Sequence, residues 1–141
     1  DCRVGDHCIL ANAVTLAGHV ELGDWVILGG LAAVHQFCRV GSHAMAGGGT
    51  ILVQDLPPFV ICNGNPAAAH GLNSEGLKRR GFSAESIAAL RRAYKTVYKE
   101  GLTAAAASEH LLQAVAQAAD AAAELRLLAD FVRTSKRGIV R

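Results

Sequence analysis

Residues 19–30, HVELGDWVILGG, are as apolar as a buried strand, yet a glycine or another small residue interrupts them at short, regular steps. Counting in steps of six from Val4 reaches only aliphatic residues: Val4, Leu10, Leu16, Leu22, Leu28, Val34, Val40, Ala46 and Leu52. The next residue is usually Gly or Ala, and the fifth residue of most hexads is small or β-branched. Such an unbroken hexapeptide period predicts a parallel β-helix, in which every hexad forms one flat side and one corner.

The period also predicts the cross-section of this β-helix. Three hexads would close a triangular coil of 18 residues, with the aliphatic side chains pointing toward the axis. We expect the glycines to serve the corners, where the absence of a Cβ lets the chain turn. An ordinary sheet of strands and turns is the alternative, but it would produce the period only locally.

The period ends at residues 54–67, QDLPPFVICNGNPA, where Pro57 and Pro58 remove donors from the ladder. We therefore expect two domains: β-helix coils over residues 1–70 and an α-helical domain over residues 71–141. At the other end, Asp1 already lies inside a hexad and in register. The expectation is that this chain is the C-terminal part of a longer β-helix.

Three helices are predicted after the β-helix. Ser83 can cap a helix that runs to about Lys99, and Thr103 can cap the alanine-rich segment that follows. A last helix is marked by Leu125, Leu128 and Val132.

Composition narrows the class of protein. No stretch approaches the roughly 18 apolar residues of a spanning helix, and the four cysteines form no CxxC or zinc-binding spacing. We therefore expect a soluble, cytoplasmic protein that does not insert into a membrane. Residues 1–60 carry two basic and five acidic side chains, whereas residues 71–141 carry twelve and seven. The C-terminal half is therefore the candidate anion-binding part.

Residues 18 apart should stack in columns at the strand spacing of about 4.8 Å. One column then holds Asp1, His19 and Phe37, the next holds Gly18 and Gln36, and His35 lies one step further along. This cluster could bind a phosphate, or polarise a carbonyl with a glycine amide as the oxyanion donor. Surface histidines on solvated turns are the alternative, and the columns alone leave both open.

Two further features bear on metals and partners. His7 and His43 share a column but lie roughly 9.6 Å apart, too far to hold one metal within a subunit; we expect no metal and no cofactor, although zinc between two subunits stays open. Several large apolar residues should face outward and could form a threefold interface: Ile9, Trp25, Ile27, Leu31, Phe37 and Ile51. Cover by the helical domain is the competing explanation.

Several stretches resemble one family, the UDP-N-acetylglucosamine O-acyltransferases of lipid A synthesis. They are LAGHVELGD (16–24), GGLAAVHQFCRVG (29–41), QDLPPFVICNGNPA (54–67), NSEGLKRRGFSAESIAALRRAYKTVY (73–98) and TSKRGIVR (134–141), and they span nearly the whole chain. The hexads alone are generic, but AVHQFC and GLKRRGFS are specific. Crossovers between parallel strands are right-handed in about 98% of cases, yet this resemblance implies a left-handed β-helix.

The resemblance also implies an activity. In this family a homotrimer moves an R-3-hydroxyacyl chain from acyl carrier protein to the 3-hydroxyl of UDP-N-acetylglucosamine, in clefts between neighbouring β-helices. No nucleic acid is implied. The basic run Lys78, Arg79 and Arg80, with Arg91, Arg92 and Lys95, would suit an acidic carrier protein, or would be a solvated helix face. A sister N-acyltransferase and a catalytically silent trimeric binding module are the alternatives.

Site residues follow from the resemblance, position by position. Asp1 would orient the general base, a histidine that would precede Asp1, and Gly18 would give its amide to the thioester oxyanion. The 141 residues alone are therefore expected to be inactive. The residues that would line the cleft and bind the substrates are His19, His35, Gln36, Asn73, Glu75, Arg79 and Arg80. Gly48 would lie at the end of the acyl chain, which implies a long-chain donor.

Overall fold

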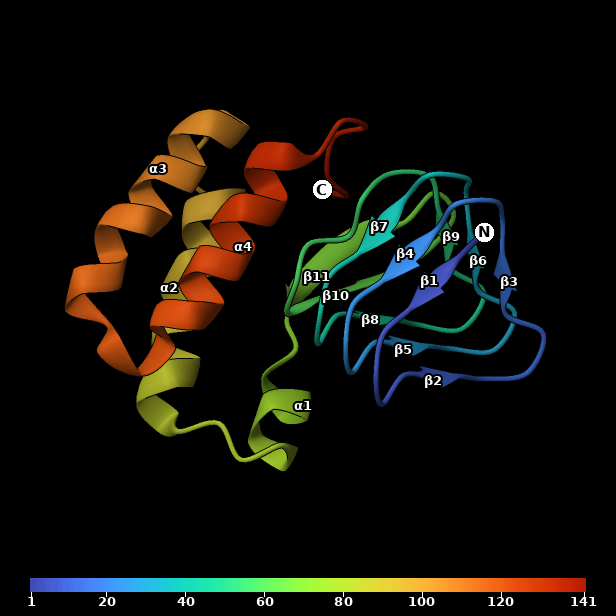
Figure 1. Ribbon diagram of the computed structural model, residues 1–141, viewed down its shortest axis with the longest axis horizontal. Coiled ribbons are helices and arrows are strands. Elements are labelled where there is room, and N and C mark those ends of the chain that lie inside the picture. Colours follow the sequence, from blue (N-terminus) through green and yellow to red (C-terminus); the bar gives the residue numbers. More distant parts are fainter. The chain divides into compact units, whose positions relative to one another are not determined.

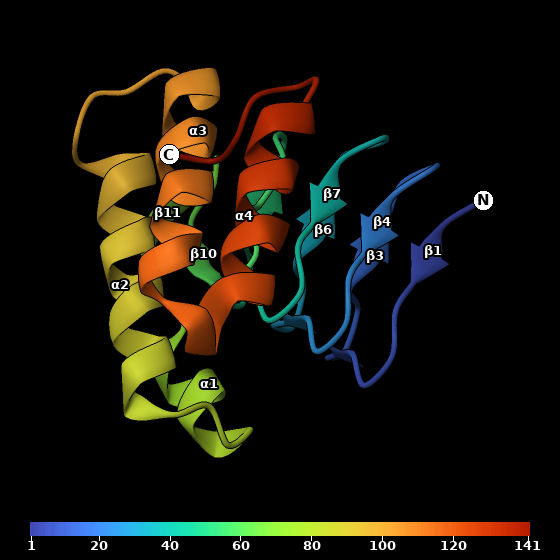
Figure 2. The same cartoon turned by 60° about the vertical axis from the view of Figure 1, so that its left-hand side comes forward.

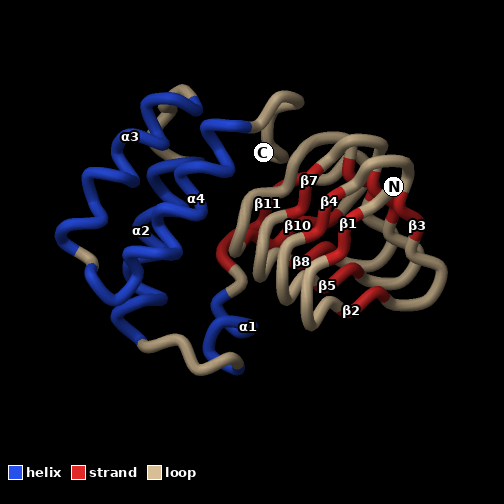
Figure 3. The backbone as a smooth tube through the Cα atoms, in the orientation of Figure 1, coloured by secondary structure: helices blue, strands red, loops and turns tan.

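The computed structural model describes all residues, Asp1–Arg141. Its N-terminal part is a solenoid of short strands joined by tight turns, seen as red segments between tan corners in Figure 3. The strands are β1 (Arg3–Val4), β2 (Ile9–Leu10), β3 (Thr15–Leu16), β4 (Glu21–Leu22), β5 (Ile27–Leu28), β6 (Ala33–Val34), β7 (Arg39–Val40), β8 (Met45–Ala46) and β9 (Ile51–Leu52). They form three parallel ladders, β1-β4-β7, β2-β5-β8 and β3-β6-β9 (Figure 1). The predicted left-handed parallel β-helix is confirmed.

The register of the ladders is the predicted one. Arg3 pairs with Glu21, and Glu21 pairs with Arg39, so each coil repeats after 18 residues (Figure 2 shows β1, β4 and β7 in successive coils). Two positions of each hexad fill the interior. The buried set is Val20, Leu22, Val26, Leu28, Ala32, Val34, Cys38, Val40, Ala44, Ala46, Thr50 and Leu52.

The corners differ from the prediction that glycines serve them. The left-handed turn position of successive hexads is held by His7, Ala13, His19, Trp25, Leu31, Phe37 and His43, all with positive φ, and only then by Gly49. The regular glycines have another role. A Cβ on Gly29 would lie 2.5 Å from the amide nitrogen of Gly48 in the next coil. These glycines therefore let the coils stack closely rather than let the chain turn.

The last coil is shorter than the others. Met45 pairs with Ile61 and Ala46 with Cys62, a repeat of 16 residues instead of 18. Pairing also continues past the two prolines, because β10 (Val60–Asn63) extends the β8 ladder and pairs antiparallel with β11 (Ala68–Leu72). The hexad pattern thus ends before the sheet does.

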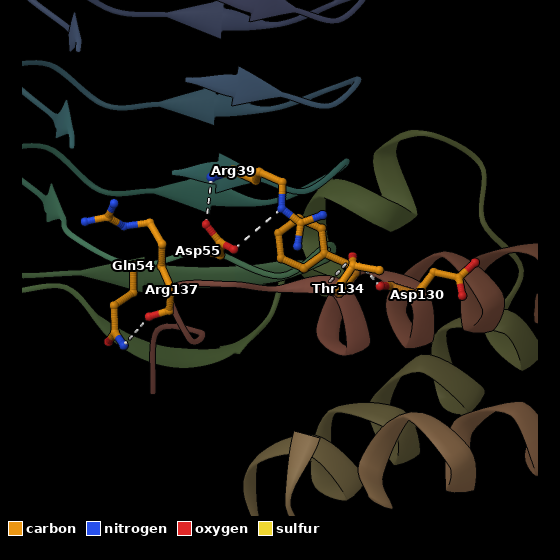
Figure 4. Close-up of polar contacts among 7 residues, drawn as sticks. Arg39, Gln54, Asp55, Asp130, Thr134 and Arg137 are labelled. Carbon is orange, nitrogen blue, oxygen red and sulfur yellow. Dashed lines mark hydrogen bonds and ion pairs between the residues drawn. The ribbon is translucent and has the colours of Figure 1, made fainter. Parts of the chain in front are cut away.

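The chain forms two compact units: Asp1–Asn73 together with Lys136–Arg141, and Ser74–Ser135. The division expected from the sequence placed residues 136–141 with the helices. Backbone pairing explains the difference, because Asp55 donates its N–H to the carbonyl of Gly138 (3.1 Å) and accepts from the N–H of Val140 (2.8 Å). Gln54 Nε2 also donates to the Arg137 carbonyl at 3.1 Å (Figure 4).

The second unit is helical. It contains α1 (Ser74–Arg79), α2 (Ala84–Tyr98), α3 (Ala104–Ala114) and α4 (Ala122–Thr134), with 3₁₀ turns at Val115–Gln117 and Ala119–Ala121. Both predicted caps are confirmed: the Ser83 side chain accepts from the Ser86 N–H and that of Thr103 from the Ala106 N–H. No helix has both the length and the apolar character needed to cross a bilayer.

Candidate functional site

One corner of the β-helix brings Asp1, His19 and Phe37 into the predicted column. The rings of His19 and Phe37 stack with centroids 4.8 Å apart and planes 7° from parallel. On the other side of His19, its Nε2 lies 3.7 Å from Asp1 Oδ2. Both side chains of this pair are exposed, so the pair contributes little to stability and is available to a ligand.

Gly18 precedes His19 and presents an amide that the fold leaves unused. Its carbonyl accepts the N–H of Phe37 (3.0 Å), but its own N–H donates to no acceptor in the structure. At another corner, the matching N–H groups of Asp6 and Asp24 are satisfied by Asp24 Oδ1 (2.8 Å) and Ser42 Oγ (3.0 Å). An exposed N–H without a partner is the kind of donor that can stabilise an oxyanion.

The same corner borders an open hollow of about 480 Å³, lined by Asp1, Cys2, Arg3, His19 and Glu21. Sequence reasoning singled out Asp1 and His19 but missed the other three residues. Arg3 and Glu21 could have been found with the 18-residue rule, because they are Cα partners in adjacent coils. The hollow thus combines acidic and basic groups beside the Gly18 amide.

His35 and Gln36 lie one coil further along the same corner. Both residues are exposed, and the His35 N–H donates to the Leu52 carbonyl at 2.8 Å. No side-chain hydrogen bond or ion pair connects either residue to Asp1 or His19. The structure therefore places them on one corner with His19 and leaves their side chains available.

Gly48 and Asn73 lie elsewhere in this unit. Gly48 is exposed at a different corner, where an added Cβ would be 3.4 Å from the Gly30 carbonyl oxygen. Asn73 is only 3% exposed, and its Nδ2 donates to the His43 carbonyl at 2.9 Å. Little of the Asn73 side chain is left for contact with a ligand.

Within the helical unit, α1 carries two of the predicted residues, Glu75 and Arg79, and Arg80 follows directly after the helix. Glu75 Oε1 lies 3.6 Å from Lys78 Nζ, and burial lowers the pKa of Arg80 below its ordinary value. Arg80 nevertheless remains a cation at neutral pH, because guanidinium is protonated in any protein environment. The other basic residues of the predicted run are exposed: Lys78, Arg79, Arg91, Arg92 and Lys95.

The two histidines considered for a metal are separated by an aromatic ring. Trp25 stacks on His7 with centroids 4.2 Å apart and on His43 with centroids 6.4 Å apart. No group of three or more His, Cys, Asp or Glu side chains converges anywhere in the structure. Within one chain, the rings of His7 and His43 therefore face Trp25 and not each other.

Comparisons with known proteins agree on one family. A family model described as UDP-N-acetylglucosamine O-acyltransferase, domain 2, matches residues 55–140. Proteins named acyl-[acyl-carrier-protein]–UDP-N-acetylglucosamine O-acyltransferase are 55% identical in Thiobacillus denitrificans and 52% identical in Burkholderia mallei, over all 141 residues. This chain spans about half of their length, 53% and 54%.

Solved structures give the same result. A UDP-N-acetylglucosamine O-acyltransferase from Moraxella catarrhalis aligns with a TM-score of 0.94 and 45% identity, over 100% of this chain and 53% of that one. A relative from Acinetobacter baumannii aligns with a TM-score of 0.91 and 46% identity, over 100% of this chain and 54% of that one. Both likenesses cover the β-helix coils and the helices together.

Proposed function

The chain belongs to the family of UDP-N-acetylglucosamine O-acyltransferases, and we therefore propose that the intact enzyme acylates the 3-hydroxyl of UDP-N-acetylglucosamine. The donor is an R-3-hydroxyacyl chain on acyl carrier protein, and the reaction is the first step of lipid A synthesis. The observation that carries the proposal is the corner where the free N–H of Gly18 lies beside the Asp1 and His19 pair.

The proposed chemistry is nucleophilic attack on a thioester. A histidine immediately before Asp1 takes the proton of the sugar 3-hydroxyl, and the oxygen attacks the thioester carbonyl. The negative charge that develops on the carbonyl oxygen is stabilised by the N–H of Gly18. When the C–S bond breaks, the proton passes to the departing phosphopantetheine thiolate and the ester remains on the sugar.

Other residues are assigned to binding. Asp1 orients the base, while His19, His35 and Gln36 hold the acyl and diphosphate groups. Glu75 and Arg79 of α1, with Arg80 directly after it, bind the nucleotide and the phosphopantetheine arm. Gly48 leaves room for the end of a long acyl chain, because no side chain occupies that position.

We also propose the partners and the compartment. The exposed basic side chains of α1 and α2 complement an acidic acyl carrier protein. Large apolar side chains on the outside of the β-helix, including Ile9 (58% exposed) and Leu31 (70% exposed), support a homotrimer. The proposed compartment is the cytoplasm, as expected from the sequence.

An acceptor comparison tests the activity. The intact enzyme is incubated with a 3-hydroxyacyl carrier protein and either UDP-N-acetylglucosamine or its 3-amino analogue, and the products are identified by mass spectrometry. We expect an alkali-labile ester on the hydroxyl acceptor. Acylation of the amine alone would identify an N-acyltransferase, and the absence of any product with either acceptor would indicate a binding module.

A further inference from the structure

At two turns of the β-helix, a side chain of the next coil accepts the N–H of the residue before the left-handed position. The N–H of Asp6 donates to Asp24 Oδ1 at 2.8 Å, and the N–H of Asp24 donates to Ser42 Oγ at 3.0 Å. Each acceptor lies 18 residues further along the chain, in the same column of the next coil. A short side chain that carries an oxygen therefore closes this donor.

Closure also depends on the residue before the donor. Gly5 precedes Asp6, and a Cβ on Gly5 would lie 2.5 Å from Asp24 Oδ1. Gly23 precedes Asp24, and a Cβ on Gly23 would lie 2.6 Å from Ser42 Oγ. Both distances are far shorter than van der Waals contact, so the accepting oxygen occupies the space that a methyl group would fill. An oxygen can accept this N–H only where the preceding residue is glycine.

The turn that carries Gly18 meets neither condition. Ala17 precedes Gly18 and holds the same hexad position as Gly5 and Gly23. The residue 18 further along is Gln36, whose side chain is one methylene longer than that of aspartate and makes no hydrogen bond in the structure. By the hexad repeat, the methyl group of Ala17 occupies the space that holds the accepting oxygen at the closed turns.

Another turn shows that a preceding glycine does not close the donor by itself. Gly29 precedes Gly30, and Gly48, which has no side chain, lies 18 residues beyond Gly30. The Gly30 N–H donates to no acceptor in the structure. The preceding glycine and the short oxygen-bearing side chain are therefore both required.

We propose that Ala17 is a positioning residue that keeps the Gly18 N–H open for the thioester oxyanion. Its methyl group excludes an acceptor from the next coil, and Gln36 supplies no short acceptor. Ala17 does not contact the reacting atoms and acts only through Gly18. The inference rests on the proposed function, because it concerns why the proposed oxyanion donor is not already occupied.

Rebuilding a closed turn around Gly18 tests the proposal without substrate. In the intact enzyme, Ala17→Gly and Gln36→Ser are combined, which reproduces the sequence pattern around Asp24. We expect the introduced hydroxyl within about 3 Å of the Gly18 nitrogen in a crystal structure. Exchange of this amide with solvent, followed by NMR, should slow about tenfold, the factor for a hydrogen bond of about 1.4 kcal/mol.

The single variants show which residue controls closure. Neither Ala17→Gly nor Gln36→Ser alone should slow exchange at Gly18, because each leaves one of the two conditions unmet. Slow exchange in Gln36→Ser alone would show that the methyl group does not exclude the acceptor. That result, or wild-type exchange in the double variant, would overturn the inference.

A variant at a closed turn tests the closure rule itself. Ser42→Ala removes the oxygen that accepts the Asp24 N–H, so exchange of that amide should become about tenfold faster. The thermal midpoint of each variant shows whether the fold is kept. Unchanged exchange at Asp24 in a folded variant would mean that the side chain does not close the donor, and the inference would be overturned.

Steady-state kinetics test whether transfer needs the open N–H. The losses caused by Ala17→Gly and by Gln36→Ser are measured singly and then compared with the loss in the double variant. The double variant should lose about tenfold more kcat than the product of the single losses, with the same KM as Gln36→Ser, because only the transition state uses the donor. Single losses that simply multiply would overturn the inference.

These measurements separate the inference from the proposed function. If the wild-type enzyme transfers no acyl group to either acceptor, the proposed function fails, and exchange at Gly18 still decides whether Ala17 keeps this N–H open. If the wild-type enzyme transfers the acyl group and the single losses multiply, the proposed function stands and the inference fails.

Discussion

At each corner of the β-helix a single residue takes the left-handed conformation, and side chains as large as histidine, tryptophan and phenylalanine occupy it. Left-handed backbone costs a non-glycine residue roughly 1–2 kcal/mol. Ring stacking between coils, as between His19 and Phe37 at 4.8 Å, offsets part of this cost. His19, to which we assign a binding role, thus lies at a position where the fold also uses its ring.

Two histidines in the same turn conformation provide a matched pair of variants. His19 lies beside Gly18 and Asp1, whereas His7 stacks on Trp25 at a different corner. In the intact enzyme, His19→Gln should lower kcat/KM by at least about tenfold, the loss expected for one substrate hydrogen bond to a charged group. His7→Gln should leave kcat/KM near the wild-type value. Equal losses in steady-state assays would show that the His19 effect is structural.

The buried thiol of Cys62 predicts a pH dependence of stability. Burial raises the pKa of Cys62 from 9.0 to about 12, so the unfolded chain loses this proton at a lower pH than the folded chain does. The free energy of unfolding should therefore fall as pH rises from about 9 to 12, by about 4 kcal/mol from this thiol. Urea titrations of wild type and Cys62→Ala across this range measure the difference. Parallel pH profiles of the two proteins would contradict the assignment.

Acyl-chain length depends on Gly48 in the proposed function. An added Cβ meets only ordinary contacts, 3.4 Å from the Gly30 carbonyl oxygen, so a larger side chain should be tolerated by the fold and would extend into open space. Gly48→Met in the intact enzyme should shift the preference toward shorter donors. Competition between carrier proteins loaded with long and short 3-hydroxyacyl chains measures this, and an unchanged preference would remove Gly48 from the acyl site.

At the scale of the elements, glycines at the ends of strands permit the close spacing of the coils. Gly29 follows β5, and its Cβ would meet the amide of Gly48 at 2.5 Å, whereas the Cβ of its neighbour Gly30 would meet nothing closer than the Asn12 carbonyl at 3.6 Å. The adjacent coil therefore leaves no room for a Cβ at Gly29, whereas it leaves room for one at Gly30.

This difference is directly testable. Gly29→Ala should destabilise the β-helix by about 1–3 kcal/mol, the usual cost of overpacking, because the next coil must move away. Gly30→Ala should cost much less. Urea unfolding of both variants gives the two values, and a Gly30→Ala loss as large as that of Gly29→Ala would show that coil spacing is not what Gly29 protects.

The elements also show how far the sequence predicts this structure. The hexad positions from Val4 to Leu52 predict the strands, the interior and the column of Asp1, His19 and Phe37, because every eighteenth residue is subject to the same packing. The role of the glycines is not predicted, since the atoms that exclude a side chain at these positions belong to the adjacent coil. The return of residues 136–141 to Asp55 is also missed, because a single backbone bridge has no periodicity.

For the molecule as a whole, the residues proposed for catalysis and the basic residues proposed for binding lie in different units. The β-helix unit carries the Gly18 amide with Asp1 and His19, and the helical unit carries the cations of α1 and α2. The sequence predicts both sets through the resemblance and the charge asymmetry. It does not predict the buried hydrogen bond of Asn73, because nothing in the hexad pattern shows which carbonyl a residue beyond the repeat will meet.

We propose that acyl transfer takes place at the corner formed by Asp1, Gly18 and His19. A crystal structure of the intact enzyme with a non-hydrolysable acyl-phosphopantetheine analogue would test it. We expect the carbonyl oxygen of the analogue within about 3 Å of the Gly18 amide nitrogen, the distance of an oxyanion hydrogen bond. Binding of that carbonyl at the corner of His7, Trp25 and His43, or at any site remote from Gly18, would contradict the claim.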